Sequence, residues 1–483
     1  MRIHTSRPRV SVAFVVLALF LSVAVAGFLS AQVAGPARVS LVITGGIVVT
    51  MDGSHRVLWP GAVAIDGARI VAVDAPAVIA QKYAGSDVLH ADGQVVMPGL
   101  INTHGHAPMV MYRGLADDLA LMDWLQKYIF PAEAKTVSPE MVRTGTRLAA
   151  LEMIQSGTTL FTDMYYFEEE IGRAAKAAGL RGVLGETIIG FPVADAKTPA
   201  ESLARAERFM QEFKGDPLIV PAVAPHAMYT NDTATLKACV ELARKYGAPI
   251  VTHISETLDE GKTSQEKYHL SPVSYLDSIG FWGPNVIAAH FVHVSDEDLA
   301  ILKKRGAGLS HNPESNMKLA SGVAPVTKAL TAGINVGLGT DGAASNNDLD
   351  MFEAMRQAAF LHKLAENDPT AVSAQTALDM ATIGGARALG MADRIGSLEA
   401  GKLADVIIVS MQSARQTPLY NPVSHLVYVT RGDDVTTTIV NGKVLMRDRR
   451  VLTLNAQAVI AEANALAKKV KAAVEGAQSS APR

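Results

Sequence analysis

The sequence predicts an α/β protein: a (β/α)8 TIM barrel with a small β-sandwich domain built from both chain ends. Strand-like apolar runs alternate with helix-like segments through the middle of the chain, which is typical of parallel α/β folds. β-rich segments with turn signals occur at both ends. The chain has 483 residues, of which 49% are hydrophobic, so it can bury a barrel core and a second, smaller core.

The first part of the β-sandwich is predicted over residues 38–97. Short β-rich runs at 41–50, 62–65 and 70–73 are broken by turn signals such as Asp66-Gly67. A similar pattern returns in the second part, residues 395–452, where the turn Asn441-Gly442 stands between two runs. Strand-like runs there are residues 404–409, 426–430, 436–440 and 444–446.

The barrel is predicted over residues 98–394. Helical patterns such as residues 139–156 and 232–246 separate most of the strand candidates. The number of strand candidates matches the eight strand–helix units of a TIM barrel. They are residues 99–104, 159–164, 182–187, 219–224, 250–254, 286–290, 308–311 and 334–340. The last segment, residues 453–483, is predicted to be an Ala/Lys-rich helix over 455–475 and a tail.

The N-terminus has the layout of a secretory signal peptide. Arg2, Arg7 and Arg9 precede an uncharged apolar run over residues 10–29, and small residues follow. The run is also about as long as the ~20 residues that span a bilayer, so an uncleaved anchor is the alternative. We therefore expect residues 1–31 to be a signal peptide or a membrane anchor, and the protein to be exported to the periplasm or the extracellular space.

Charge and cysteine content narrow the classes of function. The formal net charge is −3 and no dense Lys/Arg stripe occurs, which argues against nucleic-acid binding. Cys239 is the only cysteine, so the chain has no internal disulfide. It stands in an apolar helical pattern, which favours a small core residue over a reactive thiol.

Polar residues gather where the predicted strands end. His104 and His106 follow the first strand, and residues two apart on an extended chain point to the same side, so both imidazoles would aim at one point. His253, His290 and Asp341 end later strands, and strand ends share one face of a TIM barrel. Each residue alone has a structural alternative, since a lone histidine is often structural and Asp341 could be a turn residue or helix cap. Together they favour a metal-dependent hydrolase.

Several motifs resemble the amidohydrolase superfamily, and most closely its aminohydrolase branch. That branch holds the S-adenosylhomocysteine/5′-methylthioadenosine deaminases and the atrazine-type s-triazine hydrolases. The resemblance covers nearly everything from about residue 39 to residue 452. It is carried by PGLINTHGH (98–106), HISET (253–257), AH (289–290) and GTDG (339–342), and extended by APM (107–109), RGLADD (113–118), WL (124–125) and PAE (131–133).

The resemblance implies a ligand set for one metal ion: His104, His106, His253 and Asp341. Three imidazoles and one carboxylate suit Zn²⁺, or Fe²⁺, better than Mg²⁺ or Ca²⁺. Binuclear relatives use a lysine on the fourth strand to bridge two metals, whereas that strand ends here at Pro225-His226. One divalent metal is therefore expected, and it would bring the pKa of bound water to about 7, giving a hydroxide that can attack a ring carbon.

The resemblance also implies roles for residues around the metal. Glu256 would be the general acid and base, His290 would orient the attacking water, and Asp341 could take the proton of that water. Glu133 and His226 would touch the substrate ring or its sugar. Trp124 lies in a long semi-apolar segment with Tyr128 and Phe130, which could form a wall over a flat heterocycle or pack as an ordinary helix.

We expect hydrolytic deamination of an aminated N-heterocycle, such as 5′-methylthioadenosine or S-adenosylhomocysteine, with release of ammonia. Members that handle homocysteine carry an Arg after the third strand, where this chain has Glu186, and this disfavours S-adenosylhomocysteine. The alternatives are an s-triazine chloro- or aminohydrolase, a cyclic-amide hydrolase and, from another class, a non-catalytic ligand-binding barrel. The expected partners are a small heterocyclic substrate and further copies of the chain in a homo-oligomer, with no nucleic acid and with membrane contact only through the N-terminal anchor.

Overall fold

Eight parallel strands form the centre of the computed structural model, which describes residues 1–3 and 35–478. Backbone hydrogen bonds close the sheet between its first and last strands: the Thr103 N–H donates to the Leu338 carbonyl at 2.9 Å, and the Asp341 N–H donates to the His104 carbonyl at 3.0 Å. In chain order the strands are β8 (Leu100–Asn102), β9 (Thr158–Tyr165), β10 (Arg181–Ile188), β11 (Ile219–Pro225), β12 (Ile250–Ile254), β13 (Val286–His290), β14 (Gly308–His311) and β15 (Val336–Leu338). The predicted TIM barrel is confirmed.

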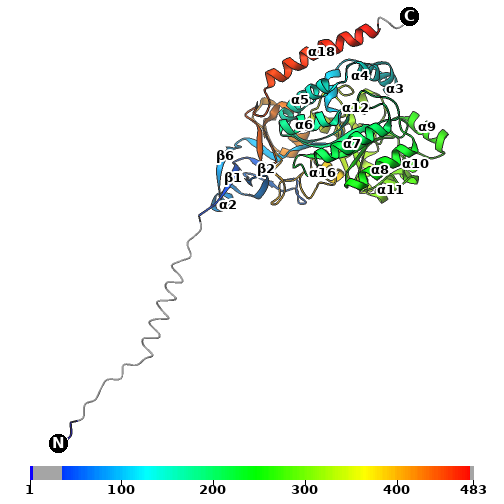
Figure 1. Cartoon of the computed structure of the whole chain (residues 1–483). Coiled ribbons are helices and arrows are strands. Elements are labelled where there is room, and N and C mark those ends of the chain that lie inside the picture. The colour runs from blue at the N-terminus through cyan, green and yellow to red at the C-terminus, as the bar shows by residue number, and fades with distance from the viewer. Residues whose placement is uncertain (4–34, 479–483) are drawn as a thin grey trace.

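The sequence forms this barrel because its strands are apolar on both faces, as a parallel sheet covered by helices requires. Alternate side chains point inward, where Leu160, Met164, Val183, Val251 and Ile287 share one buried cluster. The opposite faces pack against the surrounding helices (Figure 1). Polar residues just past the strand ends are thereby placed at one face of the barrel.

Two helices begin and end close to their predicted bounds, because capping residues mark both of their ends. Helix α5 (Pro139–Ser156) begins after Ser138, whose side chain accepts the Met141 N–H, and ends at Gly157 with φ +88°. Helix α8 (Thr233–Tyr246) begins after Asp232 and ends at Gly247 in the same way. The other helices of the barrel region are α6 (Glu168–Ala178), α7 (Pro199–Glu212), α9 (Leu258–Tyr268), α10 (Pro272–Ser278), α11 (Asp296–Arg305), α12 (Pro313–Lys318), α13 (Val326–Thr331), α14 (Met351–Ala365), α15 (Ala374–Met380) and α16 (Ile383–Ala388).

Both chain ends contribute strands beside the barrel (Figure 1). A four-stranded sheet has the order β5-β4-β1-β6, and a seven-stranded sheet has the order β19-β18-β17-β16-β7-β2-β3. The two ends meet where β16 pairs with β7, with Ile407 opposite Met97. Their bounds are β1 (Ala37–Thr44), β2 (Ile47–Val49), β3 (Val57–Leu58), β4 (Ala62–Asp66), β5 (Arg69–Asp74), β6 (Tyr83–His90), β7 (Gln94–Pro98), β16 (Val406–Ser410), β17 (Val435–Val440), β18 (Lys443–Arg447) and β19 (Arg450–Val451), with α2 (Pro76–Lys82) before β6.

This arrangement agrees with a small β domain built from both termini. A buried cluster that includes Leu41, Val63, Val96, Val406 and Ile439 joins strands of the two sheets. The division of the chain at residues 98 and 395 remains our interpretation. The predicted C-terminal helix is α18 (Ala456–Gln478), which lies along α5 and pairs Glu462 with Arg147 (Figure 1).

Two predictions of secondary structure are wrong. The single run over residues 41–50 is divided into β1 and β2, because Gly45 adopts φ +89° between them. Residues 426–430, predicted as a strand, lie largely in helix α17 (Pro422–Tyr428). Asn421 accepts the Ser424 N–H and Pro422 occupies the first helical turn, and these start signals outweigh the β-rich composition.

The segment after β8 covers the strand ends of the barrel. It consists of the 3₁₀ helix η1 (Ala107–Tyr112), α3 (Leu121–Asp123), the π-helical stretch η2 (Trp124–Ile129) and α4 (Phe130–Thr136). Short π-helical stretches are rare and often occur at functional sites. This segment brings Trp124 and Glu133 toward the face where the histidines lie.

Candidate active site

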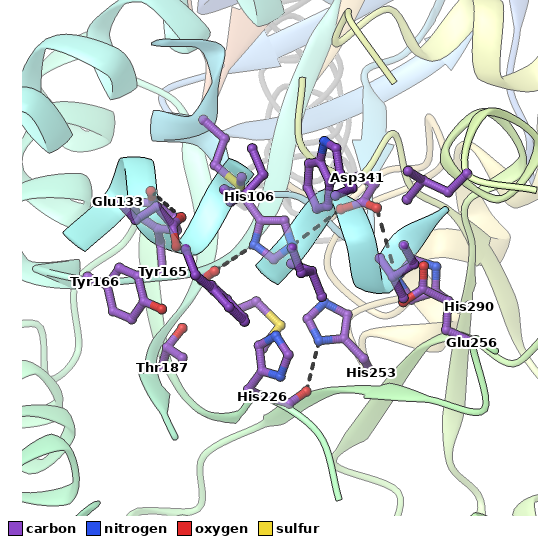
Figure 2. Close-up of a pocket in the computed structure, with 18 of the residues that line it drawn as sticks. His106, Glu133, Tyr165, Tyr166, Thr187, His226, His253, Glu256, His290 and Asp341 are labelled. Atoms are coloured by element: carbon purple, nitrogen blue, oxygen red, sulfur yellow. Dashed lines mark hydrogen bonds and ion pairs between the residues drawn. The ribbon is translucent and has the colours of Figure 1, made fainter. Parts of the chain in front are cut away.

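A pocket opens at the carboxyl ends of the barrel strands (Figure 2). Every predicted site residue except His104 lines it, and His104 is fully buried with its ring 5.0 Å from that of His106. The lining residues are His106, Met109, Leu121, Trp124, Leu125, Ile129, Phe130, Glu133, Met164, Tyr165, Tyr166, Thr187, His226, Tyr229, His253, Glu256, His290, Leu319 and Asp341.

His104 is the centre of an imidazole cluster. Its ring centroid is 5.0 Å from that of His106, 4.9 Å from that of His253 and 5.3 Å from that of His290. Neither of its ring nitrogens has a hydrogen-bond partner among the described residues, although the side chain is 0% exposed. Because an unsatisfied buried polar group is costly, the arrangement calls for a partner that side chains do not provide.

Backbone carbonyls orient two of the imidazoles toward this centre. His106 Nδ1 is 2.7 Å from the Met164 carbonyl oxygen, and His253 Nδ1 is 2.8 Å from the His226 carbonyl oxygen. Because a carbonyl only accepts, Nδ1 donates in each ring and Nε2 keeps its lone pair when the ring is neutral. Metal-binding histidines are commonly held in this way.

Asp341 adds a carboxylate to the imidazoles. Its Oδ1 is 3.2 Å from His106 Nε2 and 3.5 Å from His104 Nε2. Hydroxyls of Ser315 and Ser345 donate to Oδ2 at 2.6 and 3.1 Å. Burial alone would raise the pKa of Asp341, but the neighbouring imidazoles of His104 and His106 hold that pKa well below its usual value. The side chain is therefore an ionised ligand or base.

The potential ligand atoms form two overlapping groups, each with all atoms within 4.8 Å of one another. One group is His104, His106 and Asp341, and the other is His104, His253 and His290. The four ligands implied by the resemblance are thus divided between the groups, with His104 in both. His290, expected to orient water, lies close enough to be an alternative ligand.

Glu256 and His290 face each other at the ends of neighbouring strands. His290 Nε2 is 3.7 Å from Glu256 Oε2, and both side chains are buried. The backbone turns sharply at these strand ends, with φ +49° at Ser255 and φ +75° at His290. Burial raises the pKa of Glu256, and the neighbouring His290 opposes this shift. A carboxyl group of raised pKa is suited to carry a proton near neutral pH.

Glu133 lies at the other end of the pocket, beside Tyr165, Tyr166 and Thr187 (Figure 2). The Tyr165 hydroxyl donates to Glu133 Oε1 at 2.7 Å. Burial raises the pKa of Glu133 to about 7, while the hydrogen bond from Tyr165 lowers it. Glu133 can therefore accept hydrogen bonds from a substrate bound beside it.

His226 and Trp124 also line the pocket. Burial lowers the pKa of His226 to about 3, so its ring is neutral near pH 7. Its Nδ1 is 3.1 Å from the Thr230 hydroxyl. Trp124 is 6% exposed, and with Phe130 and Tyr229 it gives the pocket a largely aromatic wall.

Glu186 does not line the pocket, so the expectation that it disfavours S-adenosylhomocysteine loses its basis. Its Oε1 accepts from Arg205 Nε at 2.9 Å, on the outer face of β10. Because side chains alternate along a strand, the next residue, Thr187, lines the pocket instead. Glu186 therefore carries no information about which substrate the pocket accepts.

Sequence reasoning missed the residues that support the site. Asn316 Oδ1 is 2.9 Å from His290 Nδ1, Ser315 and Ser345 hold Asp341, and Tyr165 holds Glu133. Tyr165 ends β9 and could have been found by its place at a strand end. The serines and Asn316 lie in loops and a short helix whose composition gives no such signal.

Comparisons with known proteins agree with this geometry. The profile of the amidohydrolase family matches residues 95–445. A 5-methylthioadenosine/S-adenosylhomocysteine deaminase from Syntrophobacter fumaroxidans is 47% identical over 437 residues, which cover 90% of this chain and 100% of the relative. A 5′-deoxyadenosine deaminase from Methanosarcina mazei is 45% identical over 436 residues, covering 90% of this chain and 99% of the relative.

Solved structures give the same result. An adenosine deaminase from Xanthomonas campestris with bound zinc superposes with a TM-score of 0.89 at 39% identity, covering 90% of this chain and 100% of that one. A zinc-bound atrazine chlorohydrolase from Arthrobacter aurescens superposes with a TM-score of 0.81 at 24% identity, covering 88% and 100%. At that identity the second likeness concerns the fold alone.

The prediction of an exported protein is wrong. The relatives that the chain matches are nucleoside deaminases, and their names describe neither an exported nor a membrane-anchored enzyme. None of the helices within the described residues is long and apolar enough to cross a membrane. The predicted signal peptide or anchor, residues 1–31, lies outside the described residues except for residues 1–3. An apolar run behind arginines is a pattern of composition, and it does not by itself fix where a protein resides.

The matched profile spans most of the chain, and relatives at 45–47% identity align over nearly their whole length. The barrel, the strand-end histidines and Asp341 stand inside the matched region. The chain belongs to the amidohydrolase family and is a hydrolase that acts on carbon–nitrogen bonds.

Proposed function

We propose that this protein deaminates adenosine-type nucleosides by hydrolysis and releases ammonia. The observation that carries the proposal is the pair of overlapping groups of potential ligand atoms, one of His104, His106 and Asp341 and one of His104, His253 and His290, with Glu256 beside them. The names of the relatives support the choice of an adenosine-type substrate.

The donor set fits one divalent metal ion. His104, His106, His253 and Asp341 would hold it, and the two unpartnered ring nitrogens of the buried His104 support a bound cation. Imidazole and carboxylate donors favour Zn²⁺, with Fe²⁺ as the alternative, and zinc is bound in the adenosine deaminase of similar fold. A divalent cation there would lower the pKa of a coordinated water molecule toward neutrality.

Glu256, His290 and Asp341 carry out the acid–base catalysis. In the reaction, a water oxygen bonds to C6 of the purine, the bond from C6 to the amino nitrogen breaks, and ammonia leaves. Asp341 accepts a proton from water, because its carboxylate is ionised. Glu256, whose pKa is raised, delivers its proton to the ring nitrogen beside C6. The proton that Asp341 took from water then passes to the amino group, which leaves as ammonia when the C6–N bond breaks. The proton of the new C6 hydroxyl returns to Glu256 as the C6 carbonyl forms. His290, 3.7 Å from Glu256, orients the water.

The other end of the pocket binds the sugar. Glu133, held by Tyr165, accepts hydrogen bonds from the ribose hydroxyls, and His226 contacts the ring or the sugar from the opposite wall. Trp124 and its aromatic neighbours pack against the flat base. We also propose, from the sequence alone, that the enzyme is a homo-oligomer, which light scattering after gel filtration tests.

Ammonia release tests the proposed function directly. We expect release from adenosine, 5′-deoxyadenosine and 5′-methylthioadenosine, and loss of that release after metal removal. Glu256→Gln should reduce kcat by at least about 10³-fold and keep the metal content, since general acid–base catalysis contributes ~10²–10⁴-fold. Asp259→Asn, three residues along and highly exposed, is the matched control and should be unaffected. Full activity in Glu256→Gln would remove this residue from the mechanism.

A further inference from the structure

The side chain of Glu256 has few contacts that fix its direction. Its backbone is held, because the Glu256 N–H donates to Glu260 Oε2 at 3.1 Å. Its carboxyl group lies 3.7 Å from His290 Nε2 in the pocket (Figure 2). Among the described residues, that carboxyl group has one hydrogen-bond partner, the Ser321 hydroxyl, which donates to Oε1 at 3.5 Å. Long bonds of this kind in an empty site commonly tighten when substrate binds. The direction of the carboxyl group therefore depends on where Ser321 lies.

Ser321 belongs to the segment after β14 that also holds His290. The carbonyl group of Asn316 accepts the Ser321 N–H at 2.9 Å, and Asn316 Oδ1 is 2.9 Å from His290 Nδ1. Asn316 and Ser321 are both buried, with 0% and 8% of their surfaces exposed. The segment of residues 316–321 thus contacts both members of the facing pair, Glu256 and His290.

His293, just past the end of β13, fastens this segment to the turn that carries Glu256. His293 Nε2 is 2.7 Å from the Ser321 carbonyl oxygen, and because a carbonyl only accepts, Nε2 donates. The backbone N–H of His293 donates to the Ser255 carbonyl at 2.8 Å, directly before Glu256. Hydrogen bonds therefore run from Ser255 through His293 and Ser321 and back to the Glu256 side chain, which closes a ring.

Gly322 allows the close contact between the segment and His293. Its φ is +128°, and a Cβ at this position would lie 2.8 Å from Val292 Cγ1 and 3.3 Å from His293 Cε1. The first distance is too short for two carbon atoms, and the backbone conformation favours glycine. Glycine at this position therefore lets the backbone after Ser321 lie directly against the imidazole of His293.

We infer that His293 is a positioning residue, which acts through Ser321 to aim the carboxyl group of Glu256 at the ring nitrogen beside C6. This inference rests on the proposed function, because it takes Glu256 as the proton donor. Neither His293 nor Ser321 lines the pocket, so both act on the substrate only through other residues. Proton transfer needs accurate geometry, and a displacement of about 1 Å can cost ~10²-fold in rate.

Kinetics of His293→Ala and His293→Gln in the metal-loaded enzyme test this role. In His293→Ala we expect kcat for adenosine to fall at least about tenfold, with KM and metal content within about twofold of wild type. Ser321→Ala should have a similar effect. The amide nitrogen of glutamine takes about the place of Nε2 and also donates, so His293→Gln should regain most of the lost rate. A glutamine variant as slow as His293→Ala would contradict the inference.

The matched control is His425→Ala. His425 is half-buried like His293, and its Nδ1 is 3.0 Å from Gln416 Oε1, outside the pocket lining. We expect kcat and KM of this variant to equal those of wild type, because the lost hydrogen bond has no connection to Glu256.

A double-mutant cycle tests whether the effect passes through Glu256. In the Glu256→Gln background, adding His293→Ala should change the single-turnover rate by less than about twofold, because the proton that His293 helps to aim is absent. An undiminished loss in that background, or wild-type kcat in both His293→Ala and Ser321→Ala, would overturn the inference and leave the proposed function standing. No ammonia from any adenosine derivative with the wild-type enzyme would instead refute the proposed function.

Discussion

Tyr165 should position Glu133 for the ribose, and Tyr165→Phe tests this role. The change removes only the hydroxyl that donates to Glu133 Oε1 at 2.7 Å, between two side chains that are 3% and 6% exposed. Hydrogen bonds to charged groups contribute about 1.5–3 kcal/mol. At 1.36 kcal/mol per factor of ten, the lower figure corresponds to about a tenfold loss in kcat/KM for adenosine.

The assay compares adenosine with 2′,3′-dideoxyadenosine in wild type and Tyr165→Phe. If Tyr165 acts through Glu133 on the ribose hydroxyls, the loss should be seen with adenosine and be nearly absent with the dideoxy substrate. The matched control is Tyr275→Phe, whose side chain is 3% exposed and whose hydroxyl is 2.8 Å from the Thr233 hydroxyl, outside the pocket lining. Equal losses with both substrates, or no loss with adenosine, would refute the reasoning.

The same variant should change the pH dependence in a defined direction. The hydrogen bond from Tyr165 favours the charged form of Glu133 and lowers its pKa, which burial raises to about 7. Without that bond the pKa rises further, so Glu133 is protonated over a wider range of pH. The acid limb of kcat/KM for adenosine should therefore move to higher pH in Tyr165→Phe, whereas a limb that stays in place would contradict this assignment.

Three further predictions concern stability, measured by urea titration for the first. Arg181→Met should lower the free energy of unfolding by about 3–5 kcal/mol, because it removes the guanidinium that binds the buried carboxylate of Asp405 at 2.8 and 3.1 Å. Arg173→Met, at the exposed pair with Glu212, is the control and should change the free energy of unfolding by less than about 1 kcal/mol. Burial lowers the pKa of both His311 and His362, whose Nε2 atoms are 3.2 Å apart. In the unfolded chain their pKa is about 6.5, so below that pH the unfolded state binds more protons than the folded state. The free energy of unfolding should therefore fall as the pH drops below about 6.5. His362→Gln should make this fall shallower between pH 8 and pH 5, and an unchanged slope would contradict it. Removing metal with a chelator should lower Tm in wild type and much less in His104→Ala, since a ligand at ~1,000 times its Kd contributes about 4.1 kcal/mol.

The sequence predicted those features that depend on local chemistry. Strands with both faces apolar and helices with clear caps, such as α5 after Ser138, could be placed within a residue or two. The site residues on strand ends could be predicted because a parallel barrel brings all its carboxyl ends to one face. His106, His253 and Asp341 come from distant parts of the sequence, yet their position in the fold follows from this rule.

Other features depend on packing that a single sequence does not display. Residues 426–430 have strand-like composition, but the helix start at Asn421 and Pro422 determines their structure. The orientation of Glu186 depends on strand register, which places Thr187 in the pocket and Glu186 against Arg205. The support of His290 by Asn316 joins two elements whose approach is fixed only by the closed barrel.

The central claim is that His104, His106, His253 and Asp341 bind one metal ion beside Glu256. A crystal structure of protein purified without chelators, with anomalous data collected on both sides of the zinc absorption edge, tests it most directly. We expect one anomalous peak per chain, about 2.0–2.2 Å from ring nitrogens of the three histidines and a carboxylate oxygen of Asp341. A fully active enzyme with no peak there, or with its metal held by other residues, would contradict it.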